Sequence, residues 1–238
     1  MKAEMDKIFG ATIKKHHDQS ESWMSISDLM SGLMMVFLLI ALALMQRVTD
    51  EKDKIKEVAV AYQKSQIDLY ETLQTEFKDD LSKWDASIDK STLAFEFNSP
   101  EVLFSTGSSD LKPEFKNILN EFFPRYLKII EPFKQDIAEI RIEGHTSSEW
   151  TDNSDTETAY FNNMQLSQSR SLAVLLYLQK NTIQASQRTW VRQYFSGVGL
   201  ASSHPKIKQG REDKLASRRV SFLVKTNAEL KIRKILEN

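Results

Sequence analysis

The chain has 238 residues, enough for one ordinary domain with additional segments. Its formal net charge is -1, so bulk charge gives no indication of nucleic-acid binding. It contains no cysteine, which excludes disulfides, thiolate metal sites and cysteine catalysis. Charged residues make up 27% and hydrophobic residues 41%, values ordinary for a soluble protein. The long apolar sequence, however, is concentrated in one stretch, residues 26–45.

The first predicted element is a transmembrane helix over residues 25–46, preceded by a tail of residues 1–24. Residues 26–45 read ISDLMSGLMMVFLLIALALM and include one charged residue, Asp28. A helix of about 20 residues is long enough to cross the hydrocarbon core of a bilayer. A cleaved signal peptide is the alternative, because Ala-Leu-Ala at residues 41–43 resembles a cleavage site. The long tail, which contains several acids, argues against cleavage.

Asp28 is the candidate functional residue of this helix. Charged groups inside a bilayer are costly, and they usually mark paths for ions. Because an apolar environment disfavours the charged carboxylate, Asp28 is suited to bind and release a proton. Ser31, Gly32 and Met35 follow at helical spacing, so they share its face of the helix. A charge that snorkels to the membrane surface, or one that favours the helix dipole, is the alternative.

The residues around Asp28 resemble the membrane motif of flagellar stator B subunits. Residues 23–34 read WMSISDLMSGLM, and that family has a tryptophan, then Asp-Leu-Met, two small residues and Leu. The resemblance implies that Asp28 carries the ion, and Ser31, Gly32 and Met35 then form the ion-path face. A homodimer that works with a multi-span A subunit is the expected assembly, because one span cannot surround an ion path alone.

Residues 47–89 are predicted to form a helical linker. Residues 47–87 contain no proline or glycine, and apolar residues recur mostly every three or four positions. They are Ile55, Val58, Tyr62, Leu69, Leu73, Phe77, Leu81, Trp84 and Ile88. This heptad-like spacing favours a coiled coil between two copies of the chain. Packing of the helix against its own domain is the alternative.

The pattern changes after Asp89, and residues 90–238 are predicted to form an α+β domain, a mixed sheet with helices on one face. Strands are predicted at residues 93–97, 137–143, 190–195 and 220–224. Helices are predicted at residues 113–130, between Pro113 and Pro132, and at residues 166–178.

Five short motifs resemble those of OmpA-like peptidoglycan-binding domains, in the family's order and across about residues 92–225. They are LFSTGSSDL at 103–111, IEGHT at 142–146, NMQLSQSR at 163–170, GVG at 197–199 and RRVSF at 218–222. The resemblance implies a periplasmic domain that binds the stem peptide of peptidoglycan, and it therefore places the N-terminus in the cytoplasm. Lysines and arginines on the two sides of the span do not decide the orientation.

The resemblance also implies a peptidoglycan-binding pocket formed by Thr146, Asn163, Leu166 and Arg170. Arg170 can bind a carboxylate through two parallel hydrogen bonds, and Asn163 offers both a donor and an acceptor. The family's aspartate after Gly-His-Thr, which pairs with the amine of diaminopimelate, is replaced by Ser147. Either a nearby acid replaces it, or the ligand binds differently. The nearby acids are Glu149, Asp152, Asp155 and Glu157.

No metal, cofactor or catalytic site is predicted. The four histidines, His16, His17, His145 and His204, show no metal-ligand spacing. His145 stands at the end of a predicted strand and is expected to be structural. Motifs for a nucleophile triad, a P-loop or a glycine-rich phosphate loop are absent from the sequence, so an enzyme is not predicted.

The short chain, the run GHTSSEW at residues 144–150 and the missing acid resemble the B subunits of the Zorya anti-phage system. That resemblance implies a peptidoglycan-anchored subunit of a proton-driven inner-membrane motor in anti-phage defence. The implied partners are a second copy, a pentameric multi-span A subunit, peptidoglycan and the membrane, without direct nucleic-acid contact. The alternatives are a flagellar stator subunit, a static envelope tether and a soluble peptidoglycan binder released by signal cleavage. A tether has no use for a buried acid.

Overall fold

The computed structural model describes residues 2–151, 154–181 and 183–237. These residues form two compact units, divided between Glu57 and Val58. Helix α1 (Lys2–Leu81) forms the first unit up to Glu57, and the rest of the helix belongs to the second unit. The two units differ in how far their large apolar side chains are exposed.

The apolar stretch of α1 is exposed throughout. Its most apolar 18-residue window has a mean hydropathy of 2.3, and none of that window is buried by the rest of the chain. Leu29 is 73% exposed, Met35 69% and Phe37 62%. Among the described residues, α1 is the one helix with the length and composition needed to cross a membrane.

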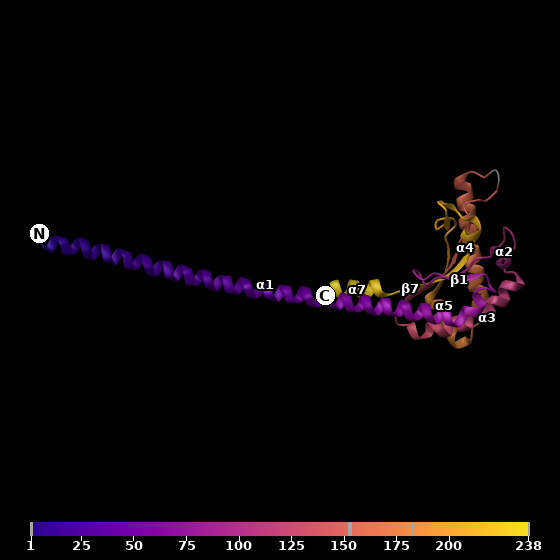
Figure 1. Ribbon diagram of the computed structural model, residues 1–238, viewed down its shortest axis with the longest axis horizontal. Helices are drawn as coiled ribbons and strands as arrows, with labels where there is room; N and C mark the ends of the chain where they lie inside the picture. The colour runs from indigo at the N-terminus through magenta and orange to yellow at the C-terminus, as the bar shows by residue number, and fades with distance from the viewer. Residues whose placement is uncertain (1, 152–153, 182, 238) are drawn as a thin grey trace. The chain divides into compact units, whose positions relative to one another are not determined.

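The second unit is built on a five-stranded sheet with the order β1-β2-β7-β3-β4. Figure 1 labels β1 and β7 of this sheet. Its strands are β1 (Ala86–Ile88), β2 (Phe95–Phe97), β3 (Ile137–Gly144), β4 (Phe195–Gly199) and β7 (Val220–Thr226). Neighbouring strands are antiparallel except β3 and β4, which are parallel. A parallel pair requires a crossover connection, which contains α4 (Thr156–Asn181) and α5 (Ala185–Tyr194).

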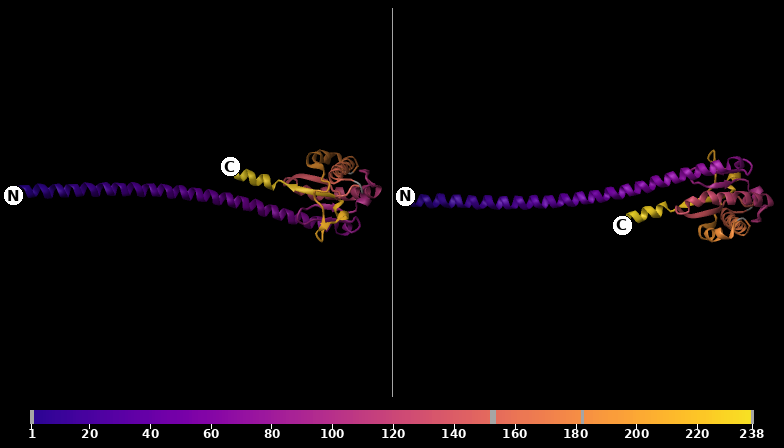
Figure 2. Two further views of the ribbon diagram at one scale, coloured as in Figure 1. Left: turned by 90° about the horizontal axis from the view of Figure 1, so that it is seen from above. Right: turned by 90° about the horizontal axis from the view of Figure 1, so that it is seen from below.

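The remaining elements are short, apart from α3. They are α2 (Pro100–Leu103), α3 (Pro113–Ile130), the 3-10 helix η1 (Glu131–Phe133), the hairpin strands β5 (Ile207–Lys208) and β6 (Arg211–Glu212), α6 (Lys214–Ser217) and α7 (Ala228–Leu236). In both views of Figure 2, α7 extends beyond the end of β7, and no residue of α7 is buried.

Aromatic side chains form the centre of the core, between the sheet and the helices. Phe122 of α3 lies 4.6 Å from Phe95, 5.2 Å from Phe97 and 5.1 Å from Phe222, measured between ring centroids. Phe77 of α1 joins the same group at 5.3 Å from Phe122. Together with α4, these contacts place the helices on one face of the mixed sheet, which confirms the predicted fold class.

The last turns of α1 pack against their own domain, as the alternative to a coiled coil expects. Leu69, Leu73 and Phe77 are at most 3% exposed and belong to the core. Arg125 of α3 also binds the polar side of this helix segment, through carboxylate contacts of 2.7 Å and 2.8 Å. Pairing between copies therefore stays a prediction for other parts of α1.

The predicted linker helix is too long at its C-terminal end. The helix ends at Leu81, and residues 86–88 form the edge strand β1. Asp85, with φ of 46°, has a left-handed backbone conformation that cannot continue a helix. Trp84 and Ile88 are nevertheless buried, so apolar spacing alone did not reveal the break.

The strand predicted at residues 190–195 is also wrong, except for its last residue. Helix α5 continues to Tyr194, and β4 begins at Phe195. The aromatic and β-branched content of this segment favoured a strand. However, Trp190 and Tyr194 are four residues apart and stack at 5.4 Å on one side of the helix, which is helical spacing.

Candidate functional site

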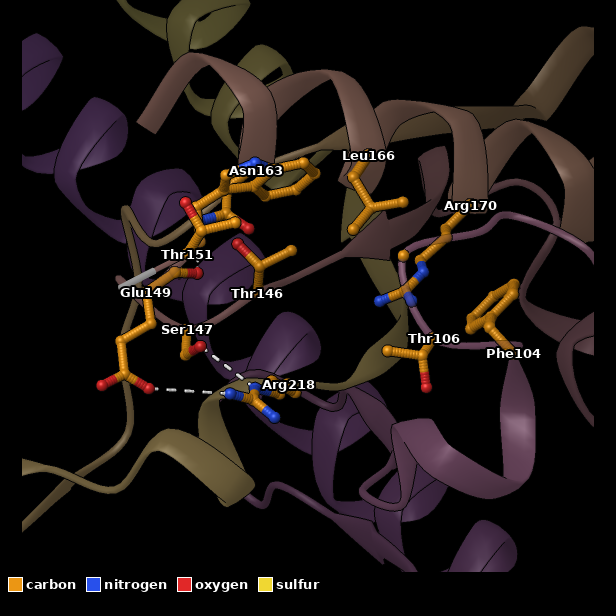
Figure 3. Close-up of a pocket in the computed structure, with 12 residues that line it drawn as sticks. Phe104, Thr106, Thr146, Ser147, Glu149, Thr151, Asn163, Leu166, Arg170 and Arg218 are labelled. Atoms are coloured by element: carbon orange, nitrogen blue, oxygen red, sulfur yellow. Dashed lines mark hydrogen bonds and ion pairs between the residues drawn. The ribbon is translucent and has the colours of Figure 1, made fainter. Parts of the chain in front are cut away.

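A cavity of about 340 Å³ lies where β3 ends and α4 begins. Thr146 follows β3, whereas Asn163, Leu166 and Arg170 lie on one face of α4 and point toward the cavity (Figure 3). The other lining residues are Phe104, Thr106, Gly107, Ser147, Glu149, Trp150, Thr151 and Arg218. The structure thus brings together all four residues that the sequence grouped into a pocket.

Two glycines allow α4 to lie directly on the ends of the parallel strands. A Cβ atom at Gly144 of β3 would lie 2.3 Å from the carbonyl oxygen of Ser167, and one at Gly199 of β4 would lie 2.4 Å from the amide nitrogen of Gln168. No side chain fits at these distances. The close approach holds the middle of α4 against the ends of β3 and β4, beside the cavity.

Arg170 is held in place through its Nε atom and its guanidinium plane. Nε donates to the carbonyl oxygen of Ser108 at 3.0 Å, and the guanidinium lies 4.8 Å from the ring centroid of Phe104. Burial, followed by the positive charge of Arg218, lowers the pKa of Arg170 to about 10, so the group stays charged at neutral pH. Among the described residues, none accepts a hydrogen bond from Nη1 or Nη2.

Thr146 and Asn163 also present polar atoms that have no partner. Thr146 is 4% exposed, and its buried Oγ1 has no hydrogen-bond partner among the described residues. Asn163 is 3% exposed; its Nδ2 donates to the carbonyl oxygen of Glu149 at 2.9 Å, while Oδ1 stays available as an acceptor. A buried polar group without a partner is costly, so Thr146 is prepared for a polar ligand, and Oδ1 of Asn163 offers an additional acceptor.

The segment that follows Thr146 is held by charged residues near the end of the chain. Arg218 donates from Nε to Oγ of Ser147 at 3.0 Å, and its Nη2 lies 3.8 Å from Oε2 of Glu149. Lys214 forms an ion pair with Oε1 of Glu149. The hydrogen bond from Lys214 holds the pKa of Glu149 below its usual range.

Among the four acids considered as replacements for the family's aspartate, only Glu149 lines the cavity in the described residues. Its carboxylate lies at the opposite end of the cavity from Arg170 in Figure 3. Asp155 instead caps α4, where it accepts from the backbone amide of Thr158 at 2.9 Å. Glu157 is exposed on α4, and Asp152 lies outside the described residues.

Sequence reasoning assigned no role to several lining residues, among them Phe104 and Arg218. Both occur within recognised motifs, the first and the last of the five. Phe104 contacts Arg170 of α4, and Arg218 reaches Ser147 because β7, which begins two residues later, pairs with β3. The occurrence of both residues in recognised motifs was visible in the sequence, but only their tertiary contacts place them in the pocket.

His145 lies on the opposite face of the sheet from the helices, within a buried polar cluster. It is 4% exposed, and its Nε2 lies 3.2 Å from Oγ of Ser221 and 3.5 Å from a carboxylate oxygen of Glu143. Burial lowers the pKa of His145, against the opposing effect of Glu143. In the described parts of the chain, no group of three or more His, Cys, Asp or Glu side chains is arranged to hold a metal.

The four residues that were predicted to form an ion-path face lie on α1. Asp28, Ser31, Gly32 and Met35 all lie within the helix and are all exposed. The hydroxyl of Ser31 donates to the carbonyl oxygen of Ser27 at 2.8 Å, so its polarity is satisfied within the helix. A Cβ at Gly32 would meet nothing within 4 Å, which leaves room for close approach by another helix.

The chain is similar to several known proteins. The OmpA family model matches residues 103–219. A MotB-like protein from Desulfovibrio vulgaris has a TM-score of 0.49 at 20% identity, covering 72% of this chain and 94% of its own. The periplasmic domain of Helicobacter pylori MotB has a TM-score of 0.43 at 17% identity, covering 64% and 97%.

The Zorya protein ZorB of Escherichia coli (strain Crooks) is 53% identical over 234 residues, covering 98% of this chain and 100% of that protein. This identity covers the apolar helix as well as the pocket. The chain therefore belongs to the Zorya ZorB family.

Proposed function

We propose that this chain is the peptidoglycan-anchored stator subunit of a proton-driven inner-membrane motor that acts in anti-phage defence. Its N-terminus lies in the cytoplasm, and its C-terminal domain lies in the periplasm. Two copies work with a pentameric, multi-span A subunit. Asp28 carries the proton, and the pocket around Arg170 holds the domain on the stem peptide of the cell wall.

The observation that carries this proposal is a single carboxylate in an otherwise apolar and wholly exposed helix segment. Among the residues whose side chains the structure describes, Asp28 has no hydrogen-bond or ion-pair partner, and the neighbouring large side chains are apolar and exposed. In a bilayer such a group requires either neutralisation by a proton or a partner that provides a polar path. Ser31 and Gly32 on the same face leave space for that partner.

The pocket supports anchoring to the wall. Arg170 offers two unused Nη donors in a planar arrangement that suits a carboxylate. Thr146 and Asn163 add unpaired polar atoms, and Leu166 adds an apolar contact. A peptide with a terminal carboxylate is the kind of ligand that uses all four residues.

The assembly of two copies is supported by the apolar surface that α1 does not use in its own domain. Val60 is 57% exposed and Ile67 45%, and they are seven residues apart on the helix. Leu69, Leu73 and Phe77 are already buried, so pairing through them would require the domain to open.

The decisive experiment replaces Asp28 with Asn in the complete system and counts phage plaques. We expect plaque numbers to rise to those of cells without the system, because an amide cannot bind and release a proton. Asp50→Asn is the matched control, since it makes the same chemical change at an exposed helical acid outside the apolar stretch. Full protection by Asp28→Asn would leave a static envelope tether as the function.

Anchoring is tested separately with purified sacculi and the full-length chain in detergent. We expect the wild-type chain to sediment with sacculi and Arg170→Gln to stay in solution. Arg211→Gln, which changes an exposed arginine outside the cavity, should sediment like the wild type. Retention of Arg170→Gln at the wild-type level would reject the pocket as the anchoring site.

A further inference from the structure

The cavity is lined by two guanidinium groups, and one of them has no acidic counterpart. Arg170 is 9% exposed, and no carboxylate among the described residues lies within 4 Å of it. A buried charge without a partner is unfavourable. The missing negative charge is therefore expected from a ligand.

The second guanidinium, that of Arg218, is held in position by a neutral hydroxyl and is only weakly neutralised by an acid. Arg218 donates from Nε to the hydroxyl of Ser147, a neutral group. Its contact with Glu149, at 3.8 Å, is near the outer limit of an ion pair, and Lys214 binds the other oxygen of that carboxylate. The Arg218 side chain is 38% exposed, and its Nη1 has no partner among the described residues.

The charges along the cavity are correspondingly unbalanced. Its lining contains two arginines and one glutamate, and the glutamate is shared with Lys214. The positive charge of Arg218 contributes to lowering the pKa of Arg170, so the two guanidinium groups repel each other. A ligand with one carboxylate compensates Arg170 alone, whereas a second carboxylate compensates Arg218 as well.

Thr146 provides an independent indication of a ligand that is rich in oxygen. Thr146 lines the same cavity, and its buried Oγ1 has no hydrogen-bond partner among the described residues. The hydroxyl can donate to a carboxylate oxygen. Glu149 lies at the far end of the cavity and contacts two cations (Figure 3), so it does not provide a free acid for an ammonium group.

We propose that the pocket selects a ligand with two carboxylates, one bound by Arg170 and the other by Arg218, and that it does not depend on the ligand's amine. This inference rests on the proposed wall binding and specifies its chemistry. Arg218 is thus the residue that determines specificity, whereas Arg170 is the residue that anchors the ligand.

The test measures binding of two soluble stem peptides to the full-length chain in detergent by isothermal titration calorimetry. One peptide ends in diaminopimelate with both carboxylates free, and the other carries one of these carboxylates as an amide. We expect the amide to bind about 10- to 100-fold more weakly, as loss of a charge-assisted hydrogen bond predicts. Acetylation of the diaminopimelate amine should change affinity less than about threefold.

Arg218→Gln should remove this discrimination, so that both peptides bind with the affinity that the amide has for the wild type. Arg211→Gln is the control and should discriminate as the wild type does. Urea unfolding of each variant checks that the domain stays folded.

Equal binding of both peptides by the wild type, or a larger loss from acetylation than from amidation, would overturn the two-carboxylate inference. Sacculus binding that still depends on Arg170 would then leave the proposed function intact. A wild-type chain that binds neither peptides nor sacculi would overturn both.

Discussion

Phe37 and Phe122 are the same residue type in the two regions of this chain, yet Phe37 is 62% exposed and Phe122 is 0% exposed. The domain buries Phe122 in its core because its surroundings are water. The apolar stretch of α1 leaves its large side chains outside because a bilayer is as apolar as they are. Both regions thus keep apolar side chains out of water, the domain by burying them in its core and the helix by exposing them to lipid.

Charged groups lead to the same distinction. In the domain, buried Glu96 is bound by Arg219 at 3.1 Å and by Lys206 at 2.8 Å, as the cost of burying a charge requires. Asp28 and Arg170 have no such partner among the described residues. In each region, we assign a function to a charge that has no partner among the described residues.

The difference between the two regions is tested most directly by truncating one phenylalanine in each of them. Phe122→Ala should lower the free energy of unfolding by roughly 3–5 kcal/mol, because it removes a ring from the centre of the core. Phe37→Ala should leave that free energy unchanged. Urea unfolding of the full chain in detergent, followed by tryptophan fluorescence, measures both. Similar losses for the two variants would contradict the separation of the two regions.

The two glycines Gly144 and Gly32 provide a second matched pair. Gly144→Ala should destabilise the domain by about 1–3 kcal/mol, because its Cβ would overlap the Ser167 carbonyl and displace α4. Gly32→Ala meets no atom in this chain and should favour the helix by up to about 1 kcal/mol. Thermal unfolding of the domain should therefore shift only for the first. A wild-type melting temperature for Gly144→Ala would show that α4 does not lie so close.

Two arginines test how much an ion pair contributes in each region. Arg125 binds Glu76 and Asp80 and is only partly exposed, so Arg125→Gln should cost about 1 kcal/mol after solvent screening. Arg47 pairs with Glu51 on the surface of α1, and Arg47→Gln should change domain unfolding by less than about 0.5 kcal/mol. The same urea titration compares them, and a larger effect for Arg47 would reverse the expected order.

The smallest expected effect is a pH dependence that only the domain shows. Because burial lowers the pKa of His145 below its ordinary value of 6.5, the unfolded chain binds the proton more readily. Stability is therefore expected to be complete above about pH 6.5 and to fall as the pH decreases from there. His145→Gln should flatten unfolding midpoints between about pH 5 and 7. The exposed control His204→Gln should retain the wild-type slope, and identical slopes for all three chains would reject this account.

Much of the fold could be predicted because its signals are local. Residues 26–45 are apolar apart from Asp28 and a few small polar residues, Pro113 opens α3, and alternation ends β3 near Gly144. The errors occurred where two local signals competed. At residues 190–195, aromatic content favoured a strand while four-residue spacing favoured a helix, and packing of Val191 in the core decided for the helix.

The candidate site was predictable only in part, through the resemblance of its motifs to OmpA-like domains. Asn163 lies before the helix predicted at residues 166–178, and the longer α4 places it on one face with Leu166 and Arg170. Arg218 lies far away in the sequence, and its contact with Ser147 depends on sheet pairing between β3 and β7. No spacing in the sequence contains that information.

The sequence by itself determined the single apolar helix, the position of Asp28 within it and the α+β character of the C-terminal domain. Each depends on periodicity or on solvent preference, which are properties of neighbouring residues. Only the tertiary structure decided that Leu69, Leu73 and Phe77 belong to the domain core, and that Arg218 and Glu149 share a cavity with Arg170. These outcomes depend on which residues far apart in the sequence pack against each other and exclude water, and the packing of the whole domain decides this.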